Sequence, residues 1–259
     1  MWKKLKRFRS WWNLEYKRFS SPGDPAKLTP IIDAAEEKNI RVVCVDTDAP
    51  ASRRSAVVCI NTEVSGKLAA ELMSSIVAQK STVAVLTGML NIDARAKMTR
   101  SFCELYPQLS DGGEVLKVIE AHEDEEEAFQ KSYVLLQECK SLASIYVNTV
   151  NCLPVCRALC ALGLSGKVAL VTSDLFRGMA PYFGKGTIRP SVHGRPFVQG
   201  QVAMRMVIDN VLNGRPLQRV RYISPHIILR SNFHLCREIH HVEGDGELDF
   251  PSLTKLSVW

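Results

Sequence analysis

The sequence predicts an α/β protein in which parallel β-sheets are covered by helices on both faces. Short apolar runs of strand length alternate with amphipathic segments of helical period from residue 26 to residue 214, and this alternation is typical of such sheets. The composition agrees, because 259 residues with 46% hydrophobic and 23% charged side chains describe an ordinary globular chain. Such a chain is long enough for one large domain or two lobes.

The first expected element is a helix over residues 26–39, with Ile31, Ile32 and Ala35 on its buried side. Pro30 leaves its first residue open. A strand over residues 41–45 follows directly. The remaining elements alternate, with strands at 56–61, 82–88, 114–121, 142–148, 167–174 and 187–194, and helices at 63–79, 93–106, 124–139, 153–162, 175–183 and 196–214.

Polar residues end most of the predicted strands. Ligands of parallel α/β sheets bind beyond the carboxyl ends of the strands, so these residues are the first site candidates. Carboxylate and amide oxygens accept hydrogen bonds from hydroxyl groups, and amide nitrogens donate to them, so the set favours a hydroxyl-rich ligand. The strand-end residues are Asp46, Asp48, Asn61, Gly88, His122, Asn148, Asp174 and His193.

Asp46 and Asp48 admit two other interpretations. They could be solvated turn acids before Pro50, or they could perform acid–base chemistry. No partner base or nucleophile stands at a supporting spacing, and the sequence has no GxSxG elbow. We therefore do not expect an enzyme.

Four patterns that resemble cofactor or metal sites have simpler explanations. Cys152, Cys156 and Cys160 share a helical face, which suits soft-metal ligands, but the apolar residues between them favour a buried face. The acids of "HEDEEE", residues 122–127, fit the dipole at a helix start. The tail acids and histidines of residues 240–247 lie among glycines, and "VSGKLA" and "GKGT" lack phosphate-loop spacing. No cofactor and no metal are expected.

The net charge of +6 resides in the opening of the chain. Of 33 basic and 27 acidic residues, seven basic and one acidic lie in residues 1–19, which leaves 26 of each in the remainder. A neutral body gives no electrostatic footprint for nucleic acid. The basic, tryptophan-bearing opening could be an interfacial anchor, a nucleic-acid arm or sequence that entered when the reading frame was truncated. Its mixed faces favour the last.

Neither export nor membrane insertion is expected from the sequence. The opening has no apolar core of secretory-signal length, and no stretch approaches ~18 apolar residues. The eight cysteines lack the spacing of a disulfide framework, which favours a reducing compartment. We predict a cytoplasmic protein.

Several stretches, in this order, resemble one family. From Ser21 to Glu238 the chain resembles the ligand-binding core shared by periplasmic sugar-binding proteins of the ribose-binding type and regulators of the lactose repressor (LacI) family. The resembling stretches are "SPGDPAKLTPIIDAAEEKNIRVVCVDTDAP", "INTEVSGKLAAELM", "VAVLTG", "SIYVNTVNCLPVCRALCALGL", "VALVTSDLF", "GTIRPSVHGRPFVQGQVAMRMVIDNVLNGRP" and "PHIILRSNFHL".

The resemblance implies a type I periplasmic-binding fold, with two lobes joined by three crossings and the ligand in the cleft between them. Residues 21–60 and 195–218 would form the N-terminal lobe, and residues 61–194 and 219–239 the C-terminal lobe. Residues 1–20 would be an opening outside the family, and residues 240–259 a flexible tail. The family's first two strands and helices and the repressor helix-turn-helix have no counterpart before Ser21, so we expect an N-terminally truncated member with one incomplete lobe.

The resemblance also implies which residues bind the ligand. Asp46 matches the family's ligand-binding acid, Asp174 matches the acid after a later strand, and Asn148 lies near the pocket asparagine. His193 falls where the last crossing supplies a polar side chain. The family's helix-start arginine would fall on Met98, so Arg95 would serve instead. The candidate ligand contacts are Asp46, Thr47, Asp48, Arg95, Asn148, Asn151, Asp174 and His193.

The main functional hypothesis is a sugar sensor domain of a LacI-type transcriptional regulator that lacks its DNA-binding segment. It would bind a small sugar or polyol, would form a homodimer as other regulators do, and would meet DNA only through the missing segment. The alternative is a substrate-binding protein, or a fragment of one, of a sugar ABC transporter.

Overall fold

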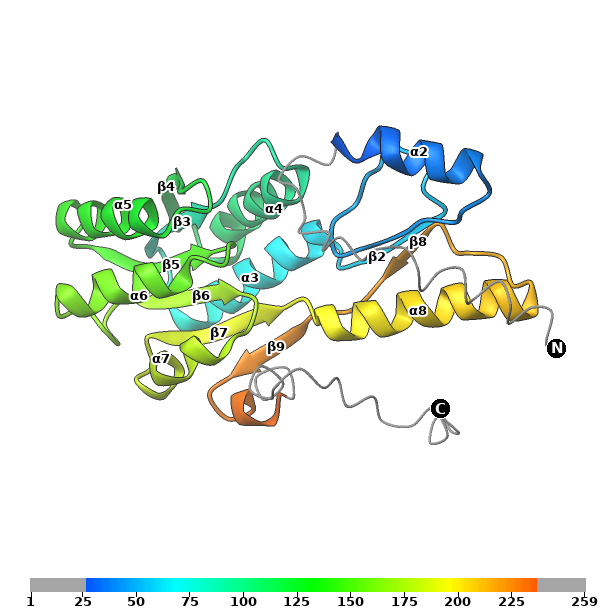
Figure 1. Ribbon diagram of the computed structural model, residues 1–259. Helices are drawn as coiled ribbons and strands as arrows, with labels where there is room; N and C mark the ends of the chain where they lie inside the picture. The colour runs from blue at the N-terminus through cyan, green and yellow to red at the C-terminus, as the bar shows by residue number, and fades with distance from the viewer. Residues whose placement is uncertain (1–26, 237–259) are drawn as a thin grey trace.

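The computed structural model describes residues 27–236 and shows two sheets that form two lobes (Figure 1). Both sheets are built mainly from parallel strands with helices packed on them, so the predicted α/β class is confirmed. The predicted basic opening and tail lie outside the described residues. Within residues 27–236, none of the helices combines the length and apolar character that crossing a bilayer requires.

The larger lobe is a six-stranded sheet in the order β4-β3-β5-β6-β7-β9. All its strands are parallel except β9, which pairs antiparallel with β7. Its strands are β3 (Thr82–Thr87), β4 (Glu114–Glu120), β5 (Leu142–Val147), β6 (Ala169–Ser173), β7 (Ile188–His193) and β9 (His226–Leu229). Its helices are α3 (Thr62–Ile76), α4 (Asp93–Leu109), α5 (Glu125–Glu138), α6 (Cys152–Ala161) and α7 (Ala180–Gly184).

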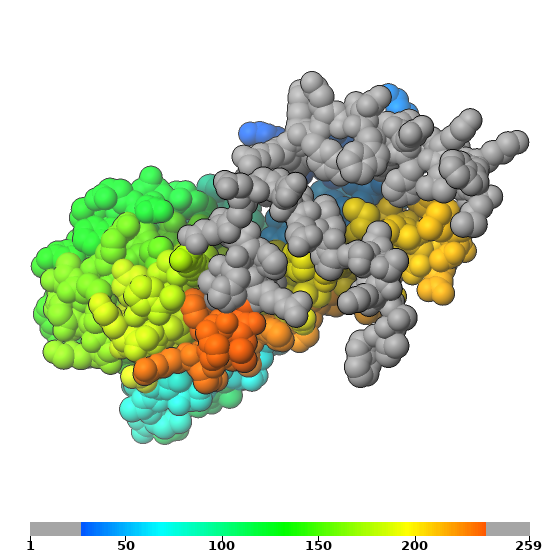
Figure 2. Space-filling model, turned by 60° about the horizontal axis from the view of Figure 1, so that its bottom comes forward, coloured from blue at the N-terminus to red at the C-terminus, as the bar shows by residue number. Residues whose placement is uncertain are grey.

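Both faces of the larger sheet are buried, as the predicted apolar strands require. Successive side chains of β3 alternate between the faces: Val83 and Val85 pack with α3 and α4, whereas Ala84 and Leu86 pack with α5 and α6. The chain after β9 returns to this lobe, where the rings of Phe233 and Phe183 lie 4.8 Å apart between centroids. Figure 2 shows this return from another side, with the orange segment against the yellow surface.

The smaller lobe has a three-stranded parallel sheet in the order β1-β2-β8. Helix α8 packs on one face through Ala203 against Val58, and α2 lies on the opposite side in Figure 1. Pro30 lies in the first turn of α2, where its missing N–H removes no helical hydrogen bond. The elements are α2 (Thr29–Glu37), β1 (Val43–Val45), β2 (Ala56–Cys59), α8 (Pro196–Asn213) and β8 (Val220–Tyr222).

Three short passages join the two sheets. The first contains Asn61, whose side chain accepts a hydrogen bond from the Val64 amide at 3.1 Å and so caps α3. The second lies between β7 and α8 at Gly194 and Arg195, and the third lies between β8 and β9 at Ser224 and Pro225. Three passages are the number that the resemblance implies.

The structure moves one lobe boundary that the sequence suggests. Residues 219–239 were expected in the larger lobe, but β8 pairs with β2 in the smaller sheet, and Arg54 donates a 3.0 Å hydrogen bond to the carbonyl of Arg219. The smaller lobe therefore includes residues up to Tyr222. The three-residue strand "VRY" is too short and too polar to show a period in sequence.

Two of the three cysteines expected on a buried helical face are buried. Cys152 and Cys156 pack in the core beneath α6, where they act as small hydrophobic side chains. Cys160 is exposed, contrary to expectation, and it lies one residue before the end of α6 at Ala161. Among residues 27–236, no group of three or more His, Cys, Asp and Glu side chains is arranged to hold a metal ion.

Candidate functional site

Asp46 and Asp174 both end strands in the left-handed backbone region. Asp46 follows β1 with a φ of 66°, and Asp174 follows β6 with a φ of 69°. Aspartate tolerates this region better than most residues. The Asp46 amide still donates to the Val58 carbonyl at 2.9 Å, so the carboxylate stands immediately beyond the last ladder bond of β1. Each lobe thus presents one carboxylate at the carboxyl end of its sheet.

Asp174 is the electrostatic centre where the lobes meet. Burial raises the pKa of its carboxyl, the nearby Arg95 charge opposes the rise, and Asp46 adds to it. His193 lowers this pKa and Glu123 raises it. The four side chains that act on the Asp174 carboxyl come from four other segments of the chain, and Asp46 among them belongs to the smaller lobe. Asp174 itself and three of these four are residues that the sequence predicts as ligand contacts.

Asn148 joins the same group through Arg95. It is fully buried at the end of β5, and its Nδ2 donates to Thr99 Oγ1 at 2.9 Å. The Arg95 guanidinium donates to its backbone carbonyl. The side-chain Oδ1 of Asn148 has no hydrogen-bond partner within the described residues. A buried acceptor without a donor is costly, so this oxygen is suited to accept a ligand hydroxyl.

Gln199 is a site residue that sequence reasoning missed. It is fully buried in the first turn of α8, and its Nε2 donates to the Gly194 carbonyl at 2.7 Å and to Asp46 Oδ1 at 3.4 Å. Its Oε1 has no partner in the part of the chain that the structure describes. The sequence signal was a polar residue inside an apolar helix start, next to the second passage between the lobes.

Glu123 is the second missed residue. It lies in the loop after β4 with a φ of 59°, and its carboxylate pairs with Arg95 Nε at 3.4 Å and accepts a hydrogen bond from Thr149 Oγ1. The acids of "HEDEEE" were assigned to a helix start. That explanation fits Asp124, which caps α5, and the three glutamates after it. Glu123 precedes the cap and directly follows His122, which was selected because it lies at a strand end. The position of Glu123 just beyond the same strand was therefore its sequence signal.

Three predicted contacts have local roles in the structure. Both carboxylate oxygens of Asp48 accept hydrogen bonds from the buried Arg54, one of them at 2.7 Å. Asn151 Nδ2 donates to the Asp124 carbonyl at 3.2 Å and so links the starts of α5 and α6. Thr47 is half-buried, and its amide donates to the Val45 carbonyl at 2.8 Å. Their ligand contacts stay predictions.

We call Asp46, Arg95, Glu123, Asn148, Asp174, His193 and Gln199 the junction site. It offers carboxylate oxygens and two unpartnered amide oxygens from both lobes, together with one guanidinium that is held by protein groups. This arrangement can accept several hydrogen bonds from one small molecule.

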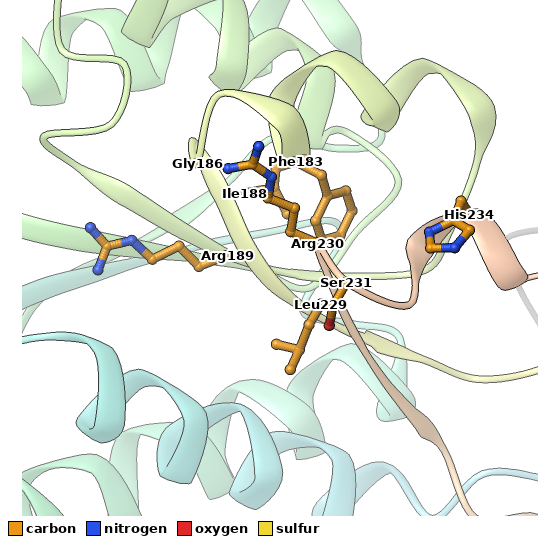
Figure 3. A pocket seen from close by; sticks show the side chains of 8 residues that line it. All are labelled: Phe183, Gly186, Ile188, Arg189, Leu229, Arg230, Ser231 and His234. Atoms are coloured by element: carbon orange, nitrogen blue, oxygen red, sulfur yellow. The ribbon is translucent and has the colours of Figure 1, made fainter.

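A hollow lies elsewhere on the larger lobe. It has a volume of about 560 Å³ and lies beside the β7 and β9 pair, and its lining combines the apolar Phe183, Ile188 and Leu229 with the basic Arg189 and Arg230 (Figure 3). None of the predicted ligand contacts lines it, so the junction site and this hollow are separate. The lining residues are Phe183, Gly186, Ile188, Arg189, Leu229, Arg230, Ser231 and His234.

Three sugar-binding proteins of known structure share this fold. The glucose-galactose binding protein GanP from Geobacillus stearothermophilus is 27% identical, with a TM-score of 0.73 over 80% of this chain and 74% of that chain. The sugar-binding protein of a sugar ABC transporter from Bacillus halodurans is 21% identical, with a TM-score of 0.77 over 82% and 76%. The arabinose binding protein AraP from Geobacillus stearothermophilus is 20% identical, with a TM-score of 0.75 over 82% and 76%.

The search of curated proteins gives no significant match. The periplasmic binding protein domain, in contrast, matches residues 20–216, which is well over half of the chain and includes every junction-site residue. The match also agrees with the two sheets and three passages described above. The chain therefore belongs to the periplasmic binding protein domain family.

Proposed function

We propose that this protein binds a small sugar or polyol at the junction site and passes the bound form to a transport system. The observation that carries the proposal is the meeting of Asp46 from the smaller lobe with Asp174 and Asn148 from the larger. Carboxylate and unpartnered amide oxygens at one place are suited to hydroxyl groups. The likeness to GanP, a glucose-galactose binding protein, supports the same ligand class.

The comparisons favour transport over regulation. The sequence alone led us to a LacI-type regulator, but membership of that family has no support among the comparisons. The similar solved structures include binding proteins of sugar ABC transporters. We therefore adopt the transport alternative. The homodimer belonged to the regulator hypothesis, whereas the cytoplasmic localisation rested on the opening of the chain and on the cysteine pattern, and both stay predictions.

Binding would favour movement of the lobes toward each other if the ligand has a higher affinity for the close arrangement than for the open one. A ligand that hydrogen-bonds Asp46 and Asp174 together stabilises the arrangement in which the lobes are close. Its effect is limited to the difference in its affinity for the close and open arrangements. Hydroxyl donors to Asn148 Oδ1 and Gln199 Oε1 would also remove the cost of leaving these buried oxygens unpaired. The transporter would then recognise the closed form.

Thermal unfolding against pentoses, hexoses and polyols tests the proposal, because a ligand that binds only the native state raises the midpoint in a dose-dependent way. We expect one neutral or modified sugar to raise it and Asp174→Asn to abolish the rise. Asp111→Asn is the matched control. Asp111 also has a positive φ, of 51°, but it is exposed at the far end of α4.

The control variant should keep the full sugar-dependent shift. A cooperative transition that no sugar or polyol shifts would overturn the proposal. A shift that Asp174→Asn leaves intact would place binding outside the junction site.

A further inference from the structure

The junction site contains more acids than bases. The groups that act most strongly on the Asp174 carboxyl are Arg95, Asp46, His193 and Glu123. Together with Asp174 they comprise three carboxylates against one guanidinium and one imidazole. Even with His193 counted as a cation, the carboxylates outnumber the cations. With all three carboxyl groups ionised, the site has a net negative charge; Asn148, His193 and Gln199 are buried, Asp174 is half-buried and Asp46 is exposed. Charges in such a partly buried setting are screened less than in water.

Arg95, the permanent cation of the site, is already engaged by the protein. Its Nε lies 3.4 Å from Glu123 Oε1, and another guanidinium nitrogen donates to the Asn148 carbonyl. Glu123 is held in turn by the Thr149 hydroxyl. These contacts match the Arg95 charge with the Glu123 charge inside the protein. Asp46 and Asp174 form no salt bridge within the described residues, although the Arg95 and His193 charges both act on Asp174.

Buried acceptors adjoin these two carboxylates. The Gln199 amide reaches Asp46 Oδ1 through Nε2, so its unpartnered Oε1 lies at the same place. Asn148 Oδ1, next to the Arg95 contact, is the other unpartnered oxygen. Both side chains are fully buried. Together these two oxygens offer positions for ligand donors beside the Asp46 and Asp174 carboxyl groups.

Resting on the sugar-binding function proposed above, we infer that the junction site prefers a sugar carrying a protonated amine over the corresponding neutral sugar, and that it rejects sugar phosphates and sugar acids. The ammonium group would lie between Asp46 and Asp174, and hydroxyl groups would donate to Asn148 Oδ1 and Gln199 Oε1. An ammonium supplies three donors and one positive charge to a place where two carboxyl groups and two unpartnered amide oxygens can accept.

The same charges explain the rejection of anions. A phosphate or carboxylate would face Asp46 and Asp174, and like charges at short range repel. The Arg95 charge is already matched by Glu123, which lies 3.4 Å from its Nε, so Arg95 offsets the charge of an anionic ligand only in part. Removing the Glu123 charge should therefore release Arg95 for anionic ligands.

Calorimetric titration of the purified chain measures this preference. The probes are D-glucosamine and D-galactosamine with their neutral parents D-glucose and D-galactose, and D-galacturonate and D-galactose 6-phosphate as anions. We expect at least one amino sugar to bind about tenfold or more tightly than its parent at low salt, with the preference shrinking as salt increases. Neither anion should bind measurably.

Two variants assign the preference to named charges. Asp46→Asn should weaken the binding of amino sugars several-fold more than the binding of their neutral parents, because asparagine keeps an acceptor oxygen but loses the negative charge. Glu123→Gln should make binding of D-galacturonate measurable, because Arg95 is then unpaired. Glu125→Gln is the matched control, since Glu125 lies two residues away with its side chain 72% exposed, paired only with the exposed Arg157.

The possible outcomes distinguish a failure of this inference from a failure of the proposed sugar-binding function. Neutral sugars that bind as tightly as their amines would overturn the inference and leave the sugar-binding function standing. An amine preference that survives in Asp46→Asn, or a gain for galacturonate that Glu125→Gln reproduces, would also overturn it. If no sugar binds at all, the proposed function fails and the inference fails with it.

Discussion

Asp174 is a carboxyl whose charge the folded chain disfavours. Burial raises its pKa from the ordinary 3.8, and Asp46 and Glu123 add to the rise against Arg95 and His193. The folded chain therefore keeps a proton that the unfolded chain releases, and the free energy of unfolding falls as pH rises from about 4 through the raised pKa. Repulsion and burial at this residue oppose stability near neutral pH, where a ligand donor would relieve them.

We expect unliganded Asp174→Asn to be more stable than the parent at about pH 7, with the difference disappearing below about pH 4. The asparagine is neutral at every pH and so lacks this penalty. Urea unfolding at the two pH values measures the effect. A variant that is less stable than the parent at pH 7 would contradict the prediction.

Glu36→Gln serves as a control of opposite sign. Burial alone would raise the pKa of Glu36, but hydrogen bonds from Ser55, the Val42 amide and Arg41 outweigh it and lower the pKa. Its charged form therefore stabilises the fold, and that contribution is lost as pH falls through the lowered pKa. This variant should be less stable than the parent at pH 7 and should approach the parent at low pH.

Asp48 has a structural role that a mutation can measure. Its carboxylate faces Arg54, whose side chain is 5% exposed and also bonds the Arg219 carbonyl. Asp48→Ala would leave a buried guanidinium without its counterion, and we expect the variant to lose about 3 kcal/mol of unfolding free energy.

The matched change for Asp48 is Glu37→Ala. It breaks the Arg53 pair, whose side chains are 66% and 59% exposed, and exposed pairs contribute about 1 kcal/mol or less. Denaturant unfolding of both variants measures the two losses of unfolding free energy. Equal losses would show that the Asp48 pair has no structural role of its own.

Helices α3 and α4 pack closely because α3 has a glycine where they meet. A Cβ at Gly66 would overlap the Met98 carbonyl and the Ser101 hydroxyl of α4. In α8, a Cβ at Gly200 would meet nothing within 4 Å. The two glycines therefore have opposite consequences when replaced by alanine.

We expect Gly66→Ala to cost about 1–3 kcal/mol of unfolding free energy, because the backbone of α4 must move to relieve the overlap. Gly200→Ala should instead stabilise the protein by about 0.5–1 kcal/mol, because alanine loses less backbone entropy in a helix. Thermal or urea unfolding of the pair measures both signs. A stabilising Gly66→Ala would show that α3 and α4 are not in tight contact there.

Most of the architecture was predictable because each layer leaves a local pattern in the sequence. The strands of the larger sheet are short apolar runs with both faces buried, and its long helices carry the expected period. β8 was not predictable, because three residues cannot display a period and their place depends on pairing with β2. Local patterns indicate which segments are strands but not which sheet each strand joins.

The residues of the candidate site were predictable where they lie at the carboxyl ends of strands. Asp46, Asn148, Asp174 and His193 end strands. The charges of Asp46 and His193 act on Asp174, and Arg95 links Asn148 to the same group. Gln199 comes from a helix interior, so only the three-dimensional contact with Asp46 reveals it. Their ligand-binding role stays a prediction, because proximity alone does not test it.

The order β1-β2-β8 makes β1 an edge strand of the smaller sheet in the described part of the chain. Val45 on this strand is exposed, and a strand with a neighbour on one side only has backbone donors and acceptors that another strand can pair with. At high protein concentration this edge strand is where aggregation would begin. Stability and solubility of the chain are therefore separate properties, and the smaller lobe governs the second.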